Sequence, residues 1–309
     1  MKSFHAITAI VACALTIAIG IGFKVESITI PGAIPGLLSF LLLLALALPI
    51  PLVLRSMGKP YFLDALLTLS WALFFTVALH DLVFIAARIG SAFPYCDTSL
   101  AHVDARFGLS TLGLNRWASH SWLGSPINRS YELLQPFMEA AVLLPILLGK
   151  IAYAKRFILG NLVAFAIAIP VFILWPAIGP WTVLPLPSSS AYLTCERELN
   201  LLRHAGVFTP GTGLGVMCFP SFHVIWPILC SRSLFVFRWL RIPAILLSIS
   251  IALSTMTTGW HYGCDVTAGI VIAFTSIILV ERIVAQMPTI RSEFQPKRLT
   301  ADDGVAVIG

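Results

Sequence analysis

The sequence predicts an all-α fold, a multi-pass transmembrane bundle of about eight helices. Of its 309 residues, 58% are hydrophobic and only 11% are charged, whereas soluble domains carry about 25% charged residues. The mean hydropathy is +0.91. The apolar residues form long runs, and a hydrocarbon core about 30 Å thick requires about 20 such residues per helix. Because unpaired backbone groups are not tolerated in lipid, these runs are expected to be helical.

Eight apolar runs are expected to form the membrane helices. They cover residues 6–22, 34–54, 63–87, 133–149, 157–176, 220–237, 242–258 and 260–284. The first run has no clear small-residue cleavage site before Lys24, so it is interpreted as a retained helix rather than a signal peptide. No internal repeat is visible, which argues against a transporter.

The distribution of Lys and Arg predicts that both termini are cytoplasmic, because cytoplasmic loops carry the excess of positive charge. With the N-terminus inside, thirteen of the 20 basic residues lie inside, mostly in short loops, and seven lie outside. The outer seven are Lys24, Arg88, Arg106, Arg116, Arg129, Arg197 and Arg203. A cell (inner) membrane location is expected. The net charge of +6 lies in short clusters between apolar runs, which speaks against a nucleic-acid partner.

Two long segments are expected on the outer side. Residues 88–132 carry Asp97, Asp104, Trp117 and Trp122, and they are interpreted as a loop with ordinary aromatic anchoring at the membrane interface. Residues 177–219 are rich in Pro, Ser and Gly and form the second predicted loop. The tail after Gln286 is polar and is expected to be disordered.

The six cysteines do not have the spacing of metal ligands. Most are expected to be small core residues. Cys96 and Cys195 fall in the two outer segments, so a disulfide between them stays open as an alternative.

The candidate chemical residues are His223, His261 and Asp265. His223 lies in FPSFH (219–223), where a Gly- and Pro-rich segment becomes a helix, and His261 lies in GWHYGCD (259–265). His261 and Asp265 are i and i+4, so they share one helix face. The carboxylate can fix the tautomer of the imidazole and leave its other nitrogen free to react. Both helices start at the outer face, so all three residues are expected to converge at one membrane depth.

Each of these residues alone has an ordinary structural explanation, since a His at a helix end or an Asp near a helix start often serves the helix itself. Their combination favours function, because ionisable groups at membrane depth are costly. Four other polar residues lie near apolar runs and are expected to serve structural pairing or to lie at the interface. They are Asp64, His80, Asp81 and Glu139.

These motifs resemble those of the type 2 phosphatidic acid phosphatase superfamily of lipid phosphatases and phosphotransferases. The family carries Pro-Ser-x-His and then Ser-Arg-x5-His-x3-Asp. Residues 220–223 match the first motif, and Ser254-Thr255-x5-His261-x3-Asp265 matches the second except at Thr255. The residues in and around both motifs are most similar to those of the branch related to inositol phosphorylceramide synthase.

The resemblance covers roughly residues 63–284 and implies a six-helix catalytic core there. Residues 1–62 would then add two N-terminal transmembrane helices, and residues 285–309 would form a cytoplasmic tail.

Two departures from the family concern the charge that neutralises phosphate. Thr255 stands where the family has Arg, and residues 174–181 lack the family's Lys-x6-Arg-Pro motif. Arg203 and Arg197, which precede the first motif, are candidates to replace these charges, and solvated loop charges are the equal alternative. Ser221, Ser254 and Thr255 are expected to complete the phosphate site, with the N-terminus of the helix at 220–237.

The resemblance implies a phosphohistidine mechanism. His261 would be the nucleophile, Asp265 would orient it, and His223 would protonate the leaving lipid oxygen and then activate the acceptor. No metal or cofactor is required. The expected substrate is a lipid phosphate ester in the bilayer. Water as acceptor makes a phosphatase, and inositol or another alcohol makes a transferase.

Two alternatives remain at this point. Two His and one Asp could hold zinc with an open position. The missing basic motifs also favour a non-catalytic or transport protein with a degenerate phosphate site.

Overall fold

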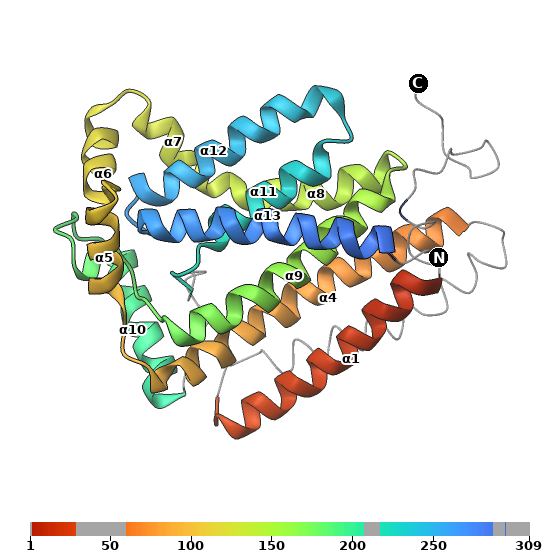
Figure 1. Ribbon diagram of the computed structural model, residues 1–309, viewed down its shortest axis with the longest axis horizontal. Coiled ribbons are helices and arrows are strands. Elements are labelled where there is room, and N and C mark those ends of the chain that lie inside the picture. Colours follow the sequence, from red (N-terminus) through yellow and green to blue (C-terminus); the bar gives the residue numbers. More distant parts are fainter. Residues whose placement is uncertain (1, 29–59, 207–216, 287–293, 295–309) are drawn as a thin grey trace.

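The structure is a computed structural model, and it describes residues 2–28, 60–206, 217–286 and 294. Within these ranges the chain forms helices and connecting loops without a strand (Figure 1). Among the described residues, five helical spans are long and apolar enough to cross a membrane, which confirms the predicted all-α membrane bundle. They are Ser3–Val25, Pro60–Ala92, Ile151–Leu174, Arg238–Thr257 and Gly263–Gln286.

Seven of the predicted runs contain a helix. They are α1 (Lys2–Val25), α4 (Pro60–Ile89), α8 (Leu134–Leu147), α9 (Ile151–Leu174), α11 (Phe222–Leu234), α12 (Arg241–Thr257) and α13 (Gly263–Gln286). The run 34–54 lies outside the described residues, as does the tail apart from Phe294. α8 and α11 have 14 and 13 residues. At 1.5 Å per residue each is about 20 Å long, so neither alone spans the hydrocarbon core.

The two segments that were predicted to be outer loops contain several helices. Residues 88–132 contain α5 (Asp97–Arg106), α6 (Thr111–His120) and α7 (Gly124–Ser130), and residues 177–219 contain α10 (Ser190–Ala205). These short helices gather at one end of the bundle (Figure 1). Trp122 is 84% exposed, as expected of an aromatic anchor, whereas Asp97 and Asp104 are buried. Cys96 and Cys195 are not joined by a disulfide.

The helix α11 lies at the centre of the bundle, because it packs against α8, α9, α12 and α13. Its side chains Ile225 and Cys230 are fully buried in the main hydrophobic core. α1 instead packs beside α4 at the edge of the bundle (Figure 1). The two helices approach closely at Gly22, where a Cβ would lie 2.8 Å from Cδ1 of Ile85.

A partly buried ion cluster joins α1, α4 and α9. On α4, Oδ1 of Asp64 lies 2.7 Å from Nε2 of His5 and 2.7 Å from Nζ of Lys155. The other ring nitrogen of His5 accepts a hydrogen bond from Nε1 of Trp71 at 3.1 Å. The Lys155 side chain is only 1% exposed. The structural pairing predicted for Asp64 is therefore confirmed.

The other three polar residues of the apolar runs have different surroundings. Glu139 accepts a hydrogen bond from Gln135 on the surface of α8 at 3.0 Å. The His80 ring packs edge-on against Phe84, with 4.5 Å between ring centroids. Asp81 is buried within α4. Glu139 thus has a pairing role of the kind predicted.

Lys155→Met should destabilise the fold, because it leaves the Asp64 carboxylate partly buried without its cation. Breaking a buried ion pair costs about 3–5 kcal/mol. Asp64 is 15% exposed, so we expect the lower end of that range. The matched change Lys150→Met at the start of α9 should cost less than about 0.5 kcal/mol. Thermal unfolding of the purified protein in detergent measures both, and equal midpoints would show that the cluster adds no stability.

Candidate active site

His261 lies in a tight turn between α12 and α13. Gly259 has a φ of 79°, a left-handed conformation that residues with side chains rarely adopt. The backbone N–H groups of Trp260 and His261 both donate to the carbonyl oxygen of Thr255, at 2.9 and 3.1 Å. The turn is therefore anchored on the last residues of α12. It holds the imidazole of His261 inside the protein, where the residue is 3% exposed.

His261 and Asp265 are in contact as predicted, but they do not share a helix face, because α13 begins at Gly263 and His261 lies in the turn before it. Nδ1 of His261 lies 3.2 Å from Oδ2 of Asp265. The same oxygen accepts hydrogen bonds from the Tyr262 N–H at 2.9 Å and from the Cys218 thiol at 3.2 Å. When Nδ1 donates to the carboxylate, Nε2 of His261 carries the lone pair.

Burial sets the protonation of the groups around this pair. It lowers the pKa of the His261 imidazole to about 4, because a charged ring would lose its hydration. It raises the pKa of the Cys218 thiol well above its usual value. The site therefore favours a neutral imidazole beside a thiol that keeps its proton and donates it.

His223 faces His261 from the first turn of α11. The two ring centroids are 5.7 Å apart, and the ring planes are inclined by 52°. Tyr131, which precedes α8, stacks on the His223 ring with a centroid distance of 4.5 Å and an interplanar angle of 17°. The two histidines of the separate motifs thus meet where α11 and α13 begin.

Ser221 ties the start of α11 to the start of α13. Its backbone N–H donates to the carbonyl oxygen of Asp265 at 3.4 Å. Gly269 permits this approach, because a Cβ there would lie only 2.7 Å from the Ser221 carbonyl oxygen. The Ser221 hydroxyl is buried and has no hydrogen-bond partner among the described residues. Since buried hydroxyls are almost always hydrogen-bonded, it is a candidate donor to a bound anion.

Asp104 supports the site from α5, a role that was not predicted from the sequence. Its carboxylate accepts hydrogen bonds from the backbone N–H groups of Gly263 at 2.6 Å and Cys264 at 2.7 Å. These are the first residues of α13, whose N–H groups have no partner within the helix. The negative charge also lies at the positive end of the helix dipole. Asp104 thus caps the helix that carries Asp265.

Asp97 holds the same region from the same face of α5, two turns before Asp104. It accepts hydrogen bonds from the Tyr262 hydroxyl at 3.1 Å and from the N–H groups of Ile178 and Gly179 at 3.0 and 2.8 Å. The available sequence signal was the i, i+7 spacing of Asp97 and Asp104, which places both on one side of a helix. Cys218, also missed, offered no such signal.

Arg203 is buried in α10 at 2% exposure. Its Nη2 donates to the Phe93 carbonyl oxygen at 2.7 Å, and its guanidinium lies 4.1 Å from the centroid of the Tyr95 ring. None of its contacts within the described ranges is with the histidine pair. Its Nε and Nη1 are buried and have no hydrogen-bond partner in those ranges. Arg197, on the same helix, is exposed.

Ser254 and Thr255, the other expected phosphate ligands, use their hydroxyls within α12. The Ser254 hydroxyl donates to the Ile251 carbonyl at 2.6 Å, and that of Thr255 donates to the Ala252 carbonyl at 2.7 Å. Both residues are fully buried. Thr255 reaches the site through its carbonyl oxygen, which holds the His261 turn.

The residues that could hold a metal differ from the predicted set of two histidines and one aspartate. Cys218 Sγ, His261 Nδ1 and an Asp265 carboxylate oxygen lie within 4.8 Å of one another, whereas His223 is not part of this group. Thiolate, imidazole and carboxylate are zinc ligands. Coordination would require the Cys218 thiol to lose its proton, and burial opposes that loss by raising its pKa.

A comparison with protein families finds a family model that matches the region of this site. The family model described as PAP2 superfamily matches residues 98–279, which is more than half of the chain. The chain therefore belongs to the PAP2 superfamily, and membership supports a phosphatase-like function on a phosphate ester in a membrane. The match runs from α5 into α13 and contains both histidines and Asp265. No curated protein and no solved structure matches the chain.

Gly269→Ala should strain the contact between α13 and the start of α11. The new Cβ would lie 2.7 Å from the Ser221 carbonyl oxygen and 3.0 Å from Cβ of Val224, and overpacking of this kind costs about 1–3 kcal/mol. Gly20→Ala is the matched control, because a Cβ at Gly20 meets nothing within 4 Å. Thermal unfolding should show a lower midpoint for Gly269→Ala only. An unchanged midpoint would contradict the close contact.

Proposed function

We propose that this protein is an integral membrane lipid phosphatase or phosphotransferase that acts through a phosphohistidine on His261. Membership of the PAP2 superfamily supports the class of reaction. The observation that carries the proposal is the buried His261–Asp265 pair, which faces His223 across 5.7 Å between ring centroids. A neutral imidazole held at Nδ1 by a carboxylate presents Nε2 as a nucleophile.

In the first step, Nε2 of His261 attacks phosphorus. A P–N bond forms as the bond between phosphorus and the lipid oxygen breaks. His223 gives its proton to that leaving oxygen, which makes the lipid alcohol a neutral leaving group. The Asp265 carboxylate balances the positive charge of the phosphorylated imidazole.

In the second step, His223 is neutral and takes a proton from the acceptor hydroxyl, which attacks phosphorus. The P–N bond breaks, and its electron pair returns to Nε2 of His261. Water as acceptor releases inorganic phosphate. The likeness of both motifs to the branch related to inositol phosphorylceramide synthase supports assays in which inositol and other alcohols compete with water.

The phosphoryl oxygens need donors, since phosphoryl transfer depends mainly on positioning and charge stabilisation. The buried Ser221 hydroxyl and the N–H groups at the start of α11 are the nearest candidates on this proposal. Arg203 is the proposed positive charge. Its two guanidinium nitrogens without partners in the described ranges suit the bidentate contact that Arg makes with phosphate. The mechanism uses no metal and no cofactor.

The proposal assigns catalysis to residues 63–284, with residues 1–62 as an addition and 285–309 as a cytoplasmic tail. The edge position of α1, beside α4, supports this division. The excess of Lys and Arg in the loops at the opposite end from the histidines supports an active site on the extracytoplasmic face of the cell membrane.

Arg203→Ala should lower catalytic efficiency towards a lipid phosphate. Loss of a charge-assisted hydrogen bond costs about 1.5–3 kcal/mol, which corresponds to roughly ten- to more than hundredfold. Arg203→Lys should recover part of this loss, because lysine keeps the charge but not the planar fork. Arg197→Ala is the matched control, because Arg197 is exposed on the same helix. Unchanged kinetics in Arg203→Ala, with a normal unfolding midpoint, would assign phosphate binding to another residue.

A nitrophenyl phosphate ester should separate the roles of the two histidines. Nitrophenolate leaves without a proton, so His223→Ala should still form the phosphoenzyme and release a burst of about one nitrophenolate per protein. Turnover should then stall, because His223 also activates the acceptor. His261→Ala should give no burst with any substrate. Asp265→Asn should form the intermediate slowly, because an amide cannot balance the imidazolium.

The trapped adduct should be acid-labile and base-stable, as phosphohistidine is, and should map to His261. A burst in His261→Ala but not in His223→Ala would reverse the two roles. Activity that requires zinc, without any adduct, would replace this mechanism with the metal alternative. A protein that releases no phosphate from a broad panel of lipid phosphates, with or without added alcohols, would favour the non-catalytic alternative.

A further inference from the structure

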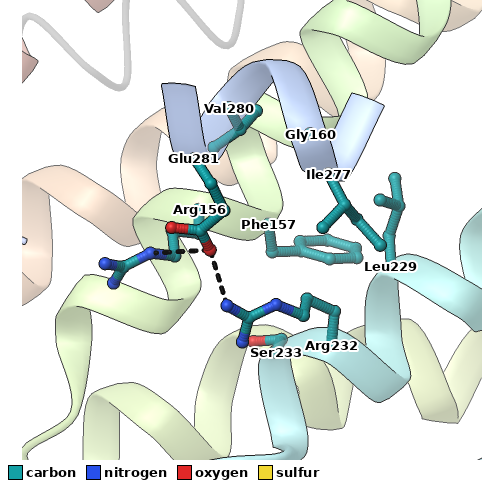
Figure 2. Close-up of a pocket in the computed structure, with 9 residues that line it drawn as sticks. All are labelled: Arg156, Phe157, Gly160, Leu229, Arg232, Ser233, Ile277, Val280 and Glu281. Carbon is teal, nitrogen blue, oxygen red and sulfur yellow. Dashed lines mark hydrogen bonds and ion pairs between the residues drawn. The ribbon is translucent and has the colours of Figure 1, made fainter. Parts of the chain in front are cut away.

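Two arginines converge on one carboxylate at the end of the bundle opposite the histidines. Nη2 of Arg232 on α11 lies 2.6 Å from Oε1 of Glu281 on α13. Nε of Arg156 on α9 lies 3.4 Å from the same oxygen. In Figure 2 a terminal nitrogen of Arg232 points at this carboxylate, whereas Arg156 approaches it through Nε and its terminal nitrogens point away. One carboxylate facing two guanidinium groups leaves a net positive charge.

The Arg156 side chain is held in place on its other sides. Its guanidinium carbon lies 5.3 Å from the Tyr153 ring centroid and 5.2 Å from that of Phe294, and Nη1 donates to the Phe294 carbonyl oxygen at 3.2 Å. Nε of Arg156 is buried without a hydrogen bond among the described residues, although the Glu281 carboxylate is near. A positive group fixed in this way presents its charge without further loss of conformational freedom.

The three charged residues line a small cavity between α9, α11 and α13, about 20 Å³ in volume. Apart from Ser233, the rest of the lining is apolar and lies beside the charged groups (Figure 2). The apolar lining consists of Phe157, Gly160, Leu229, Ile277 and Val280. The cavity is too small to enclose a headgroup, so a ligand would lie at its mouth. Its anionic part would face the arginines and its apolar part would follow the helices.

This cluster is well separated from the histidines along the same helices. His223 begins α11 and Arg232 lies near its end, whereas Asp265 begins α13 and Glu281 lies near its end. Sixteen residues at 1.5 Å each place Asp265 and Glu281 about 24 Å apart along α13. A ligand at the arginines therefore does not share the site of phosphoryl transfer.

We propose that Arg156 and Arg232 bind the phosphate headgroup of an anionic phospholipid at the membrane surface opposite the histidines. Basic pockets between transmembrane helices bind such headgroups, and guanidinium groups match phosphate oxygens in geometry. The apolar wall beside the arginines suits the start of an acyl chain. Glu281 occupies the position that phosphate would take, so it competes with the lipid for the two arginines.

Opposite effects of two charge-removing variants test this proposal. The unfolding midpoint of the purified protein is measured in neutral detergent micelles to which phosphatidylglycerol or phosphatidylcholine is added. Phosphatidylglycerol should raise the midpoint more than phosphatidylcholine. Arg232→Gln should weaken the apparent affinity for phosphatidylglycerol about tenfold or more, whereas Glu281→Gln should strengthen it by removing the competing anion. Arg282→Gln, the neighbouring exposed arginine, should leave it unchanged.

The shift should also persist in His261→Ala, which separates this site from the proposed catalytic one. Equal effects of the two lipids would overturn the proposal, as would an equal loss in Arg282→Gln and Arg232→Gln. If millimolar inorganic phosphate alone raised the midpoint equally, the site would bind a free anion, and the proposal of a phospholipid ligand would be overturned. If Arg232→Gln does not fold, native mass spectrometry of the parent and Glu281→Gln proteins decides the matter. More phosphatidylglycerol adducts on Glu281→Gln would support the site, and fewer would overturn it.

Discussion

The carboxylate of Asp265 is the group on which the geometry of the site depends. It is fully buried at the start of α13, and one of its oxygens is shared by Cys218, His261 and the Tyr262 backbone. A buried carboxylate without such partners would be very costly. The segment before α11 and the turn after α12 must therefore both stay in place around it. The backbone carbonyl oxygen of Asp265 also accepts a hydrogen bond from the Ser221 N–H, so Asp265 joins the two sequence motifs.

Two further carboxylates hold the residues that flank Asp265 in place. Asp104 caps α13, and Asp97 holds the Tyr262 hydroxyl together with two backbone N–H groups after α9. Both come from α5, which contains neither motif. The match to the PAP2 superfamily nevertheless begins at this helix. A segment that looks like a connecting loop in sequence thus fixes the position of the nucleophile candidate and of its carboxylate partner.

The bilayer accounts for the separation of charged groups along the bundle. Ionisable side chains within hydrocarbon are costly, so they lie near helix ends and pair with one another. The histidines lie where α11 and α13 begin, whereas Lys155, Arg156, Arg232 and Glu281 lie near the other ends of their helices. Asp64 with Lys155, and Glu281 with two arginines, also link neighbouring helices. Polar contacts near both ends of the bundle thus connect helices whose central parts are mainly apolar.

The sequence by itself determined the properties that depend on local spacing. Apolar run length predicted the five spans found among the described residues, because the bilayer thickness and the pairing of backbone groups allow little else. It did not show that α8 and α11 are too short to span the hydrocarbon core. The i, i+4 spacing predicted that His261 and Asp265 would meet, but the contact does not lie on one helix face, because α13 begins at Gly263 and His261 belongs to the turn before it. Only the tertiary structure decided that Asp104 caps α13, that Cys218 donates to Asp265, and that Arg203 packs against Tyr95. Asp104 and Gly263 are 159 residues apart, and no periodicity of the sequence encodes a contact across that separation. Such contacts arise only when α5 packs against the start of α13, where buried N–H groups need an acceptor.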